Sequence, residues 1–425
     1  MKNGILTRLL VAKILKKIRE SSLNFDDCLE KYSNEFKLLK KDKKMIHSIC
    51  FSTMRNIQFI NIVIKKLVKK INNNDIGFFL LISAIAQIYY LDYKPYAVIN
   101  STCESLKKTK TKYSTEFINA VLRNAERKKE NILISKINNL NYPSWFKKNI
   151  AELPSNKRKS IYKSILNKPP IHLQFKNNKD IKLINKKYIL TSKNSIMLKE
   201  KINLFELPGY KNGNWWVQDY AASLPVKFMG NVKNKKVLDM CSAPGGKTFQ
   251  LINLGASVTS FDISKKRIDI MKSNAKRLNY RINLINDDIM NFNPIYKFDI
   301  VLIDAPCSST GTIKRNPEIL FRKEMPDLKK LENIQYRLLI KASDLLKKNG
   351  ILIYAVCSIF KKEGIKQIER FLIENKNFEI DKLDTNKTMN LKKLIENGVF
   401  QSYPYNLKNI GGVDGFFIAR LIKKY

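Results

Sequence analysis

The sequence predicts a carboxy-terminal α/β domain built on a doubly wound sheet, preceded by an all-α bundle and a small α+β connecting module. Three observations indicate this order. From residue 231 to 425, apolar runs alternate with amphipathic stretches. Residues 1–134 carry apolar positions at helical spacing, whereas residues 135–230 contain short apolar stretches punctuated by proline. At 425 residues, 44% of them hydrophobic, the chain can form two or three cores.

The amino-terminal region is predicted to be a bundle of helices. Leucine and isoleucine recur at helical spacing over residues 5–18, with lysine and arginine between them. Asp75 follows a polar break and is placed to cap a helix that continues to Leu91. Two more helices are expected over residues 96–108 and 117–127. Apolar positions of this kind are more often core than binding surface, so the region predicts little about function by itself.

The other two regions are predicted to contain strands. In the connecting module, Ile171–Phe175 is a short strand, and Trp215-Trp216 are better explained as buried aromatic residues than as a stacking platform for bases. In the α/β domain the predicted strands are Lys236–Met240, Val258–Ile263, Ile282–Ile285, Phe298–Ile303, Ile351–Val356 and Phe416–Ile422. The predicted helices between them are Thr248–Leu254, Lys265–Leu278, Leu331–Lys347 and Lys362–Glu374.

The charge of the chain favours a polyanionic partner. Lys and Arg number 79 and Asp and Glu 37, which gives a net charge of +42. A surface this basic attracts nucleic acid through its phosphates. Part of the excess of basic residues has a plainer explanation, because an AT-biased genome enriches Lys, Asn and Ile together. RNA or DNA is still preferred over an acidic protein partner.

The cysteine and histidine content excludes several classes of site. Six cysteines without a C-x-x-C pair and only two histidines argue against a zinc site and a histidine-based triad, so we expect no metal. The amino terminus lacks the continuous apolar core of a signal peptide, and the longest apolar run, residues 78–91, is too short to span a bilayer. We therefore expect a cytoplasmic monomer with no membrane association and with reduced thiols.

The first predicted strand of the α/β domain leads into a glycine-containing turn and then a helix. The sequence is Asp239-Met-Cys-Ser-Ala-Pro-Gly-Gly-Lys-Thr248. Glycine lets the backbone approach a ligand closely, and the amino terminus of a helix favours negative charge. A carboxylate or phosphate could therefore bind there. The turn is close to a phosphate-binding P-loop, but Cys241 stands where that motif has its first glycine.

Three carboxylates follow successive predicted strands. Asp262 ends the second strand, where a carboxylate can accept two hydrogen bonds from a ribose diol. Asp288 follows the third strand and could accept from an adenine amino group, and Asp304 follows the fourth. A single carboxylate at such a place is more often a helix cap. Three at one edge of a sheet favour a nucleotide-type cofactor.

Two cysteines, Cys307 and Cys357, each stand where an apolar run ends. Ligands of open parallel sheets bind beyond the carboxyl ends of the strands, and neighbouring strands lie about 4.8 Å apart. If the two strands are neighbours, both thiols can face one substrate. One buried cysteine is usually inert, but such a pair beside a cofactor indicates covalent catalysis. Further along the same loop, Lys314 and Arg315 could hold phosphates.

These motifs closely resemble RNA 5-methylcytosine methyltransferases that use S-adenosylmethionine. The resemblance rests on the strings Asp239–Thr248, Asp304-Ala-Pro-Cys-Ser308 and Tyr354-Ala-Val-Cys-Ser358. Residues 46–60, 97–105 and 118–123 are similar to the NusB-like domain fused in one branch, the ribosomal RNA small subunit methyltransferase B (RsmB/Sun) family, which residues 216–219 and 414–417 also suit. The chain departs from that family at Arg315-Asn-Pro-Glu318, where Arg-His-Pro-Asp is usual, and at Val413.

The resemblance implies a Rossmann-like methyltransferase domain over residues 231–425, a NusB-like RNA-binding domain over 1–134 and a connecting module over 135–230. It implies that S-adenosylmethionine is bound by Cys241, Ser242, Ala243, Pro244, Gly245, Gly246, Lys247, Asp262, Asp288 and Asp304. Cys357 would be the nucleophile that attacks C6 of cytosine. Cys307 would assist the elimination that frees the enzyme, and Asp304 would also steady the pyrimidine at N3.

The expected function is therefore methylation of C5 of one cytosine in 16S ribosomal RNA. A related alternative is the same reaction on another RNA, either a different ribosomal site or a tRNA. A second alternative is a P-loop-like nucleotide hydrolase, against which Cys241 argues. A third is a non-enzymatic RNA-binding factor of the antitermination type, built on the helical region and the basic surface.

Overall fold

The computed structural model describes residues 3–21, 23–134, 140–200, 202–325, 327–383 and 391–425. The chain packs into two units. One comprises Met1–Glu152 together with Asn316–Pro326, and the other comprises Leu153–Arg315 together with Asp327–Tyr425. The predicted connecting module therefore contributes most of its residues to the second unit. The three-part division at residues 134 and 230 stays a prediction.

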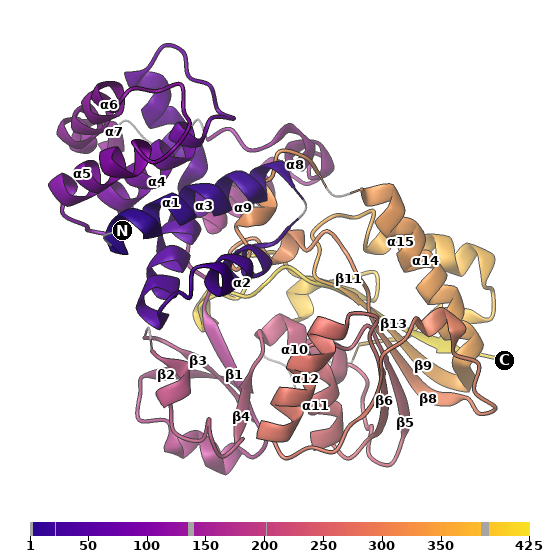
Figure 1. Ribbon diagram of the computed structural model, residues 1–425. Coiled ribbons are helices and arrows are strands. Elements are labelled where there is room, and N and C mark those ends of the chain that lie inside the picture. The colour runs from indigo at the N-terminus through magenta and orange to yellow at the C-terminus, as the bar shows by residue number, and fades with distance from the viewer. Residues whose placement is uncertain (1–2, 22, 135–139, 201, 326, 384–390) are drawn as a thin grey trace. The chain divides into compact units, whose positions relative to one another are not determined.

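The first unit is helical, as the spacing of its apolar residues predicts (Figure 1). Its helices are α1 (Asn3–Glu20), α2 (Phe25–Glu35), α3 (Lys40–Leu67), α4 (Ile76–Tyr90), α5 (Pro95–Leu106), α6 (Thr115–Arg127), α7 (Lys129–Ile134), α8 (Ser144–Asn149) and α13 (Glu318–Phe321). Helix α4 is central, because every residue from Gly77 to Tyr89 is buried. Asp75 caps α4 by accepting a hydrogen bond from the Gly77 amide at 2.7 Å, which confirms the predicted start.

A segment from late in the sequence completes the helical core. Phe321, in α13, is fully buried among residues of α1 and α3. The Arg19 guanidinium lies 5.4 Å from the centre of the Phe321 ring and donates a hydrogen bond to the Phe321 carbonyl at 3.2 Å. The chain therefore leaves the second unit after Arg315, packs into the helical unit and returns at Asp327.

The second unit contains a small antiparallel sheet in the order β2-β3-β1-β4. Its strands are β1 (Ile171–Phe175), β2 (Tyr188–Ser192), β3 (Ser195–Leu198) and β4 (Trp215–Val217), preceded by α9 (Ser155–Ile165). Strand β1 has the predicted bounds. Trp215 is fully buried and Trp216 is 4% exposed, so the interpretation of both as core residues is confirmed.

The larger sheet of the second unit is mixed, in the order β11-β12-β13-β9-β8-β5-β6-β7, with β10 paired to β13. Strands β9, β8, β5, β6 and β7 are mutually parallel, and β13 is antiparallel to β9. The strands are β5 (Lys236–Met240), β6 (Ser257–Phe261), β7 (Asn283–Ile285), β8 (Phe298–Asp304), β9 (Leu346–Val356), β10 (Phe378–Ile380), β11 (Ile395–Glu396), β12 (Val399–Gln401) and β13 (Phe417–Lys423). Six of these match predicted strands. The short strands β10 to β12 were not predicted.

Helices cover both faces of this sheet. They are α10 (Tyr220–Lys227), α11 (Gly246–Asn253), α12 (Lys265–Arg277), α14 (Leu328–Leu345) and α15 (Ile365–Glu374). Leu352, Tyr354 and Val356 of β9 pack with α14 and α15, whereas Ile353 and Ala355 pack on the opposite face with residues of α10 and α11. Burial on both faces explains why these strands read as continuous apolar runs.

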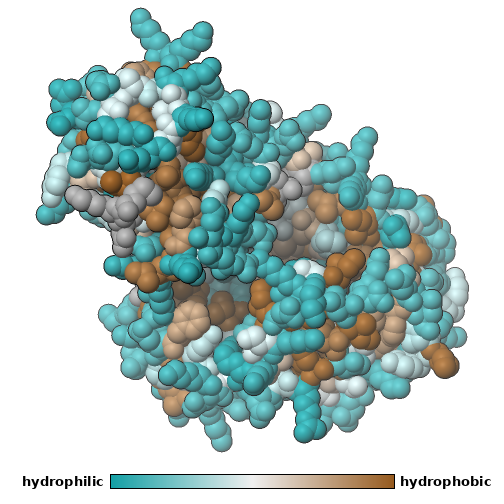
Figure 2. Space-filling model, viewed as in Figure 1, coloured by the Kyte–Doolittle hydropathy of each residue, from teal (hydrophilic) through white to brown (hydrophobic). Residues whose placement is uncertain are grey.

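The visible surface is largely hydrophilic, as a chain rich in lysine requires (Figure 2). Among the described residues, no helix combines the length and the hydropathy needed to cross a membrane. They also contain no group of three His, Cys, Asp or Glu side chains arranged to hold a metal ion.

Candidate active site

The turn between β5 and α11 has an unusual backbone. Cys241 adopts a left-handed conformation with φ of 59°, the Ala243–Pro244 peptide is cis, and Gly245 has φ of 103°. A Cβ atom on Gly245 would lie 2.6 Å from the Phe249 ring, so glycine is required both by conformation and by space. This turn brings the start of α11 close to the ends of β6 and β8.

Asp262 and Asp288 have structural partners as well as a place at the ligand edge. Asp262 accepts hydrogen bonds from the Ala243 amide at 3.0 Å and the Ser264 amide at 2.9 Å. Asp288 accepts from the Met290 amide at 3.0 Å. Asp288 is thus a helix cap, as the plainer interpretation proposed, whereas Asp262 joins two loops and the cap of α12 is Ser264. Both carboxylates also line the cavity described next.

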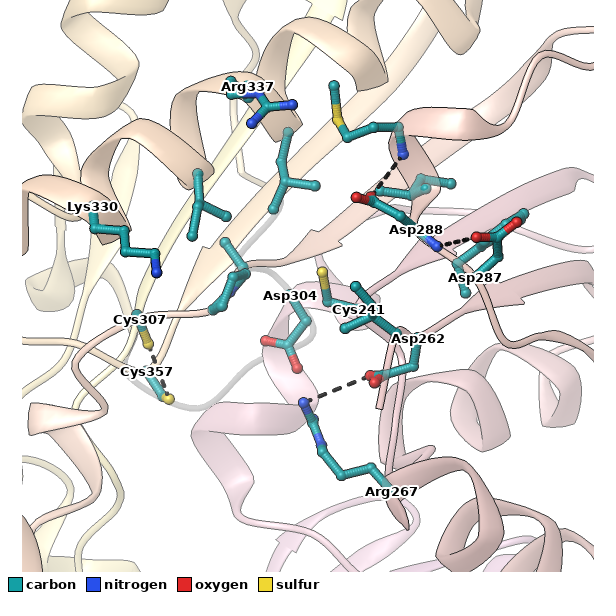
Figure 3. Close-up of a pocket in the computed structure, with 18 of the residues that line it drawn as sticks. Cys241, Asp262, Arg267, Asp287, Asp288, Asp304, Cys307, Lys330, Arg337 and Cys357 are labelled. Carbon is teal, nitrogen blue, oxygen red and sulfur yellow. Dashed lines mark hydrogen bonds and ion pairs between the residues drawn. The ribbon is translucent and has the colours of Figure 1, made fainter. Parts of the chain in front are cut away.

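A cavity of about 780 Å³ lies beyond the carboxyl ends of these parallel strands. Figure 3 shows carboxylates from the ends of β6, β7 and β8 on one side and the two thiols, Cys307 and Cys357, on the other. Lys330 and Arg337 of α14 border it as well. Its apolar lining comes from Phe261, Ile263, Ile289, Met290, Ile334 and Leu338.

The structure brings together half of the predicted site residues around this cavity. Cys241, Asp262, Asp288, Asp304, Cys307 and Cys357 all line the cavity. Residues 242–247 do not line it, and their part in binding a cofactor stays a prediction. Sequence reasoning missed Asp287, Arg267, Lys330 and Arg337, of which only Asp287 had a signal, its position beside Asp288.

Lys247 enters the site through an ion pair. Its ammonium lies 2.6 Å from the Asp304 carboxylate and 5.4 Å from the centre of the Phe416 ring. The Lys247 side chain is 9% exposed and that of Asp304 is 29% exposed. In a P-loop this lysine would reach toward phosphates, whereas here it is directed at a carboxylate, which argues against the nucleotide hydrolase alternative.

Cys307 and Cys357 are adjacent because β8 and β9 are neighbouring parallel strands, with Asp304 paired to Ala355. Their sulfur atoms lie 3.4 Å apart. The Cys307 thiol donates to Cys357, and this hydrogen bond lowers the pKa of Cys357 below its ordinary value, although burial opposes it. The same hydrogen bond and burial raise the pKa of Cys307 well above its ordinary value. Cys357 is therefore the more readily ionised thiol.

The expectation that Lys314 and Arg315 hold phosphates is not met by the structure. The Arg315 guanidinium lies 3.1 Å from both Asp219 and Asp414, in a network that also includes His172. The Lys314 side chain is buried. Arg315 therefore holds the loop after Cys307 against two buried carboxylates, and the cations that border the cavity are the three that the sequence did not indicate.

The residues of the cavity fit a nucleoside cofactor that carries a positive charge. Aspartates at the ends of β6, β7 and β8 supply acceptors for hydroxyl and amino groups, and the apolar lining suits the faces of a purine ring. Gly245 keeps the turn at the start of α11 close to this edge. A nucleoside that carries a sulfonium group would donate hydrogen bonds from its hydroxyl and amino groups to these aspartates, and their negative charge suits its positive charge.

Two protein families match the two units of the chain. Residues 227–422 match the family described as 16S rRNA methyltransferase RsmB/F, and residues 6–127 match the NusB family. The fold and the site therefore define a Rossmann-like methyltransferase joined to a NusB-like helical domain.

Curated relatives match over the whole chain, and solved structures share its fold. The ribosomal RNA small subunit methyltransferase B of Photorhabdus laumondii is 28% identical over 444 residues and covers all of both chains. The crystal structure of PH0851 has a TM-score of 0.73 at 20% identity, and covers 100% of this chain and 99% of its own. NSun6 from Pyrococcus horikoshii, solved with SFG, has a TM-score of 0.56 at 16% identity, and covers 67% of this chain and 98% of its own. Over its whole length the chain is similar to ribosomal RNA small subunit methyltransferases of the RsmB/Sun family.

Proposed function

We propose that this chain methylates C5 of one cytosine in 16S ribosomal RNA, with S-adenosylmethionine as methyl donor and a transient cysteine–C6 bond. The observation that carries the proposal is the pair of thiols 3.4 Å apart at the edge of a cavity lined by three strand-end aspartates. Methyl transfer to a ring carbon needs such a covalent helper, because C5 of cytosine is a poor nucleophile until C6 is attacked.

Cys357 is the nucleophile in this proposal. Its pKa is lowered, so a larger fraction is thiolate at neutral pH. When its sulfur bonds to C6, the electrons of the C5–C6 double bond move into the ring and C5 becomes electron-rich. Asp304, held by Lys247, then steadies the ring at N3. The base reaches these groups by leaving its stack.

The cofactor is assigned to the other side of the cavity. Asp262 and Asp288 would accept hydrogen bonds from its ribose and adenine groups, with residues 241–247 as the turn beneath them. When bound, S-adenosylmethionine supplies an electrophilic methyl group. A neighbour of this fold was solved with SFG, an analogue of that cofactor, which supports the assignment.

Cys307 is assigned to the last step. C5 must lose its proton, the bond between C6 and the Cys357 sulfur must break, and the electron pair must return to that sulfur. Cys307 is the ionisable group beside the sulfur that leaves, at 3.4 Å. The Cys307 thiol would pass its proton to the departing Cys357 sulfur, and the resulting Cys307 thiolate, whose pKa is raised, would accept the proton from C5.

The substrate is proposed from the family and from the charge. The relatives are named as small subunit ribosomal RNA methyltransferases, and a net charge of +42 suits a large polyanion. Methylation of another RNA is the nearest alternative. A purely RNA-binding factor of the antitermination type is less well supported, because it leaves the thiol pair without a role.

The test is methyl transfer by the full-length protein. Purified protein is incubated with labelled S-adenosylmethionine and, separately, naked 16S rRNA, small ribosomal subunits or tRNA, and the products are mapped by bisulfite sequencing. We expect one bisulfite-resistant cytosine in 16S rRNA. Modification confined to tRNA would show that tRNA, and not 16S rRNA, is the substrate. RNA binding without methyl transfer to any of the three RNA samples would favour the non-enzymatic alternative.

A further inference from the structure

Glu363 is a buried acidic residue to which the sequence assigned no role. It lies between the end of β9 and the start of α15, and it has no exposed surface. A carboxylate in such a place needs hydrogen-bond donors to offset the loss of water. Its donors come from the two loops that carry the cysteines.

Each oxygen of the Glu363 carboxylate has two partners. Oε1 accepts from the Ser308 amide at 2.7 Å and from the Gln335 side chain at 3.2 Å. Oε2 accepts from the Ser308 hydroxyl and the Ser358 hydroxyl, each at 2.5 Å. Because both serine hydroxyls donate to one atom, a single carboxylate joins the loop after β8 to the loop after β9.

The two serines are the residues that directly follow the two thiols, Ser308 after Cys307 and Ser358 after Cys357. Consecutive Cα atoms are about 3.8 Å apart, so a serine that is held fixes the backbone from which the preceding cysteine projects. The Thr310 hydroxyl lies 3.1 Å from both serine hydroxyls and accepts from the Ile359 amide at 3.3 Å, which ties the loops together a second time.

Glu363 is itself held in place from two sides. The Tyr354 hydroxyl, on β9, donates to the Glu363 carbonyl at 2.7 Å. Gln335, on α14, donates to the Glu363 carboxylate and also to the Pro306 carbonyl, at 3.0 Å, one residue before Cys307. We call Glu363 with Ser308 and Ser358 the carboxylate clamp. It is anchored to β9 and α14 and does not depend on exposed side chains.

We infer that Glu363 is a positioning residue which sets the distance and the direction of the Cys307 and Cys357 thiols through Ser308 and Ser358. The inference rests on the proposed function for its catalytic consequence. The spacing of the thiols themselves does not depend on that function. The Glu363 charge also faces Cys307 and helps to keep that thiol protonated.

A plainer role for Glu363 would be to stabilise the fold. A measurement of thiol spacing, in addition to enzyme activity, separates this role from positioning of the thiols. Diamide oxidises two nearby thiols to a disulfide, in which the thiols give up two protons and two electrons and the diazene is reduced to a hydrazine. With sulfur atoms 3.4 Å apart, Cys307 and Cys357 need only a small movement to reach the bond length of about 2.05 Å. The rate of this disulfide, followed by peptide mapping, reports thiol placement without any RNA.

The experiment compares Glu363→Ala with Glu363→Gln in the full-length protein. Alanine removes all four hydrogen bonds, so we expect the 307–357 disulfide to form about 10-fold more slowly and kcat to fall about 100-fold, because a misplacement near 1 Å costs that much. The KM for S-adenosylmethionine should stay near that of wild type. Glutamine can accept at Oε1 and donate to the serine hydroxyls, so it should restore most of both rates. Glu369→Ala, an exposed residue of α15, is the matched control.

The outcomes are distinguishable. If Glu363→Ala is folded and forms the disulfide at the wild-type rate with wild-type kcat, the inference is overturned and Glu363 serves stability only. If no RNA is methylated by wild-type protein, the disulfide rates still test the inference while the proposed function fails. If Glu363→Ala does not fold, Ser308→Ala and Ser358→Ala each remove one hydroxyl donor to Oε2, while the amide of residue 308 still donates to Oε1. We expect Ser358→Ala, which loses its whole contact with Glu363, to slow the disulfide about 3-fold, and Ser308→Ala to slow it less. Unchanged rates in both variants would refute the inference.

Discussion

The loops that follow β8 and β9 contain the same dipeptide, cysteine and then serine, and both serines bind the same carboxylate. The two thiols nevertheless differ. One hydrogen bond lowers the pKa of Cys357 and raises that of Cys307. Burial and Asp304 oppose the lowering at Cys357, whereas Ser309 and Lys247 support it. Glu363 adds to the raised pKa of Cys307. The acidity of a cysteine here therefore depends on what its sulfur faces rather than on its motif.

The largest effect is expected at Cys357. Replacing Cys357 with Ala removes the nucleophile, so we expect methyl transfer to fall by at least about 10⁴-fold, into the background. The measurement is a single-turnover assay with labelled S-adenosylmethionine and saturating RNA. Cys103→Ala, in the helical unit, is the control and should keep full activity. Substantial activity in Cys357→Ala would remove the distinction between the two thiols.

A different effect is expected at Cys307. If Cys307 serves elimination, Cys307→Ala should still form the bond between Cys357 and C6 but release it slowly. The expected result is a protein–RNA adduct that survives denaturing electrophoresis, with turnover lowered by about 10²-fold or more, as for loss of a general base.

The double variant Cys307→Ala/Cys357→Ala is the control for the adduct and should show none. An adduct in Cys357→Ala, with none in Cys307→Ala, would exchange the two roles and would contradict the pKa argument. Mass spectrometry of the cross-linked peptide identifies the cysteine that carries the RNA.

Much of the catalytic fold follows from local pattern. The parallel strands are buried on both faces, so β5 and β8 appear in the sequence as short apolar runs bounded by polar residues. The placement of Cys307 and Cys357 was predictable for the same reason, because each stands within a few residues of the end of such a run. The short strands β10 to β12 were missed, since two or three residues carry too little periodicity to indicate a strand.

The parts that could not be predicted depend on contacts distant in sequence. Nothing in Asn316–Pro326 indicates that Phe321 completes a core whose other members precede residue 126. Glu363 is 55 residues from Ser308, and a lone glutamate before a helix has the pattern of an exposed cap. Arg315 was expected at phosphates because charge alone does not reveal that Asp219 and Asp414 lie beside it. Pairings of this kind follow from the folded chain and leave no local signal.

The smallest effect is expected at Ser309, whose hydroxyl lies 3.7 Å from the Cys357 sulfur. When Cys357 is ionised this hydroxyl donates to it, which lowers the pKa of Cys357. Ser309→Ala should therefore raise that pKa and move the rising limb of kcat/KM to higher pH by less than one unit, equivalent to less than about 1.4 kcal/mol. Activity should be lower than that of wild type below the wild-type pKa and converge with it at high pH.

Alkylation of Cys357 by iodoacetamide, followed against pH, measures the same shift without RNA. An unchanged limb would mean that Ser309 does not contribute, and that the low pKa of Cys357 depends on the hydrogen bond from Cys307 and on Lys247.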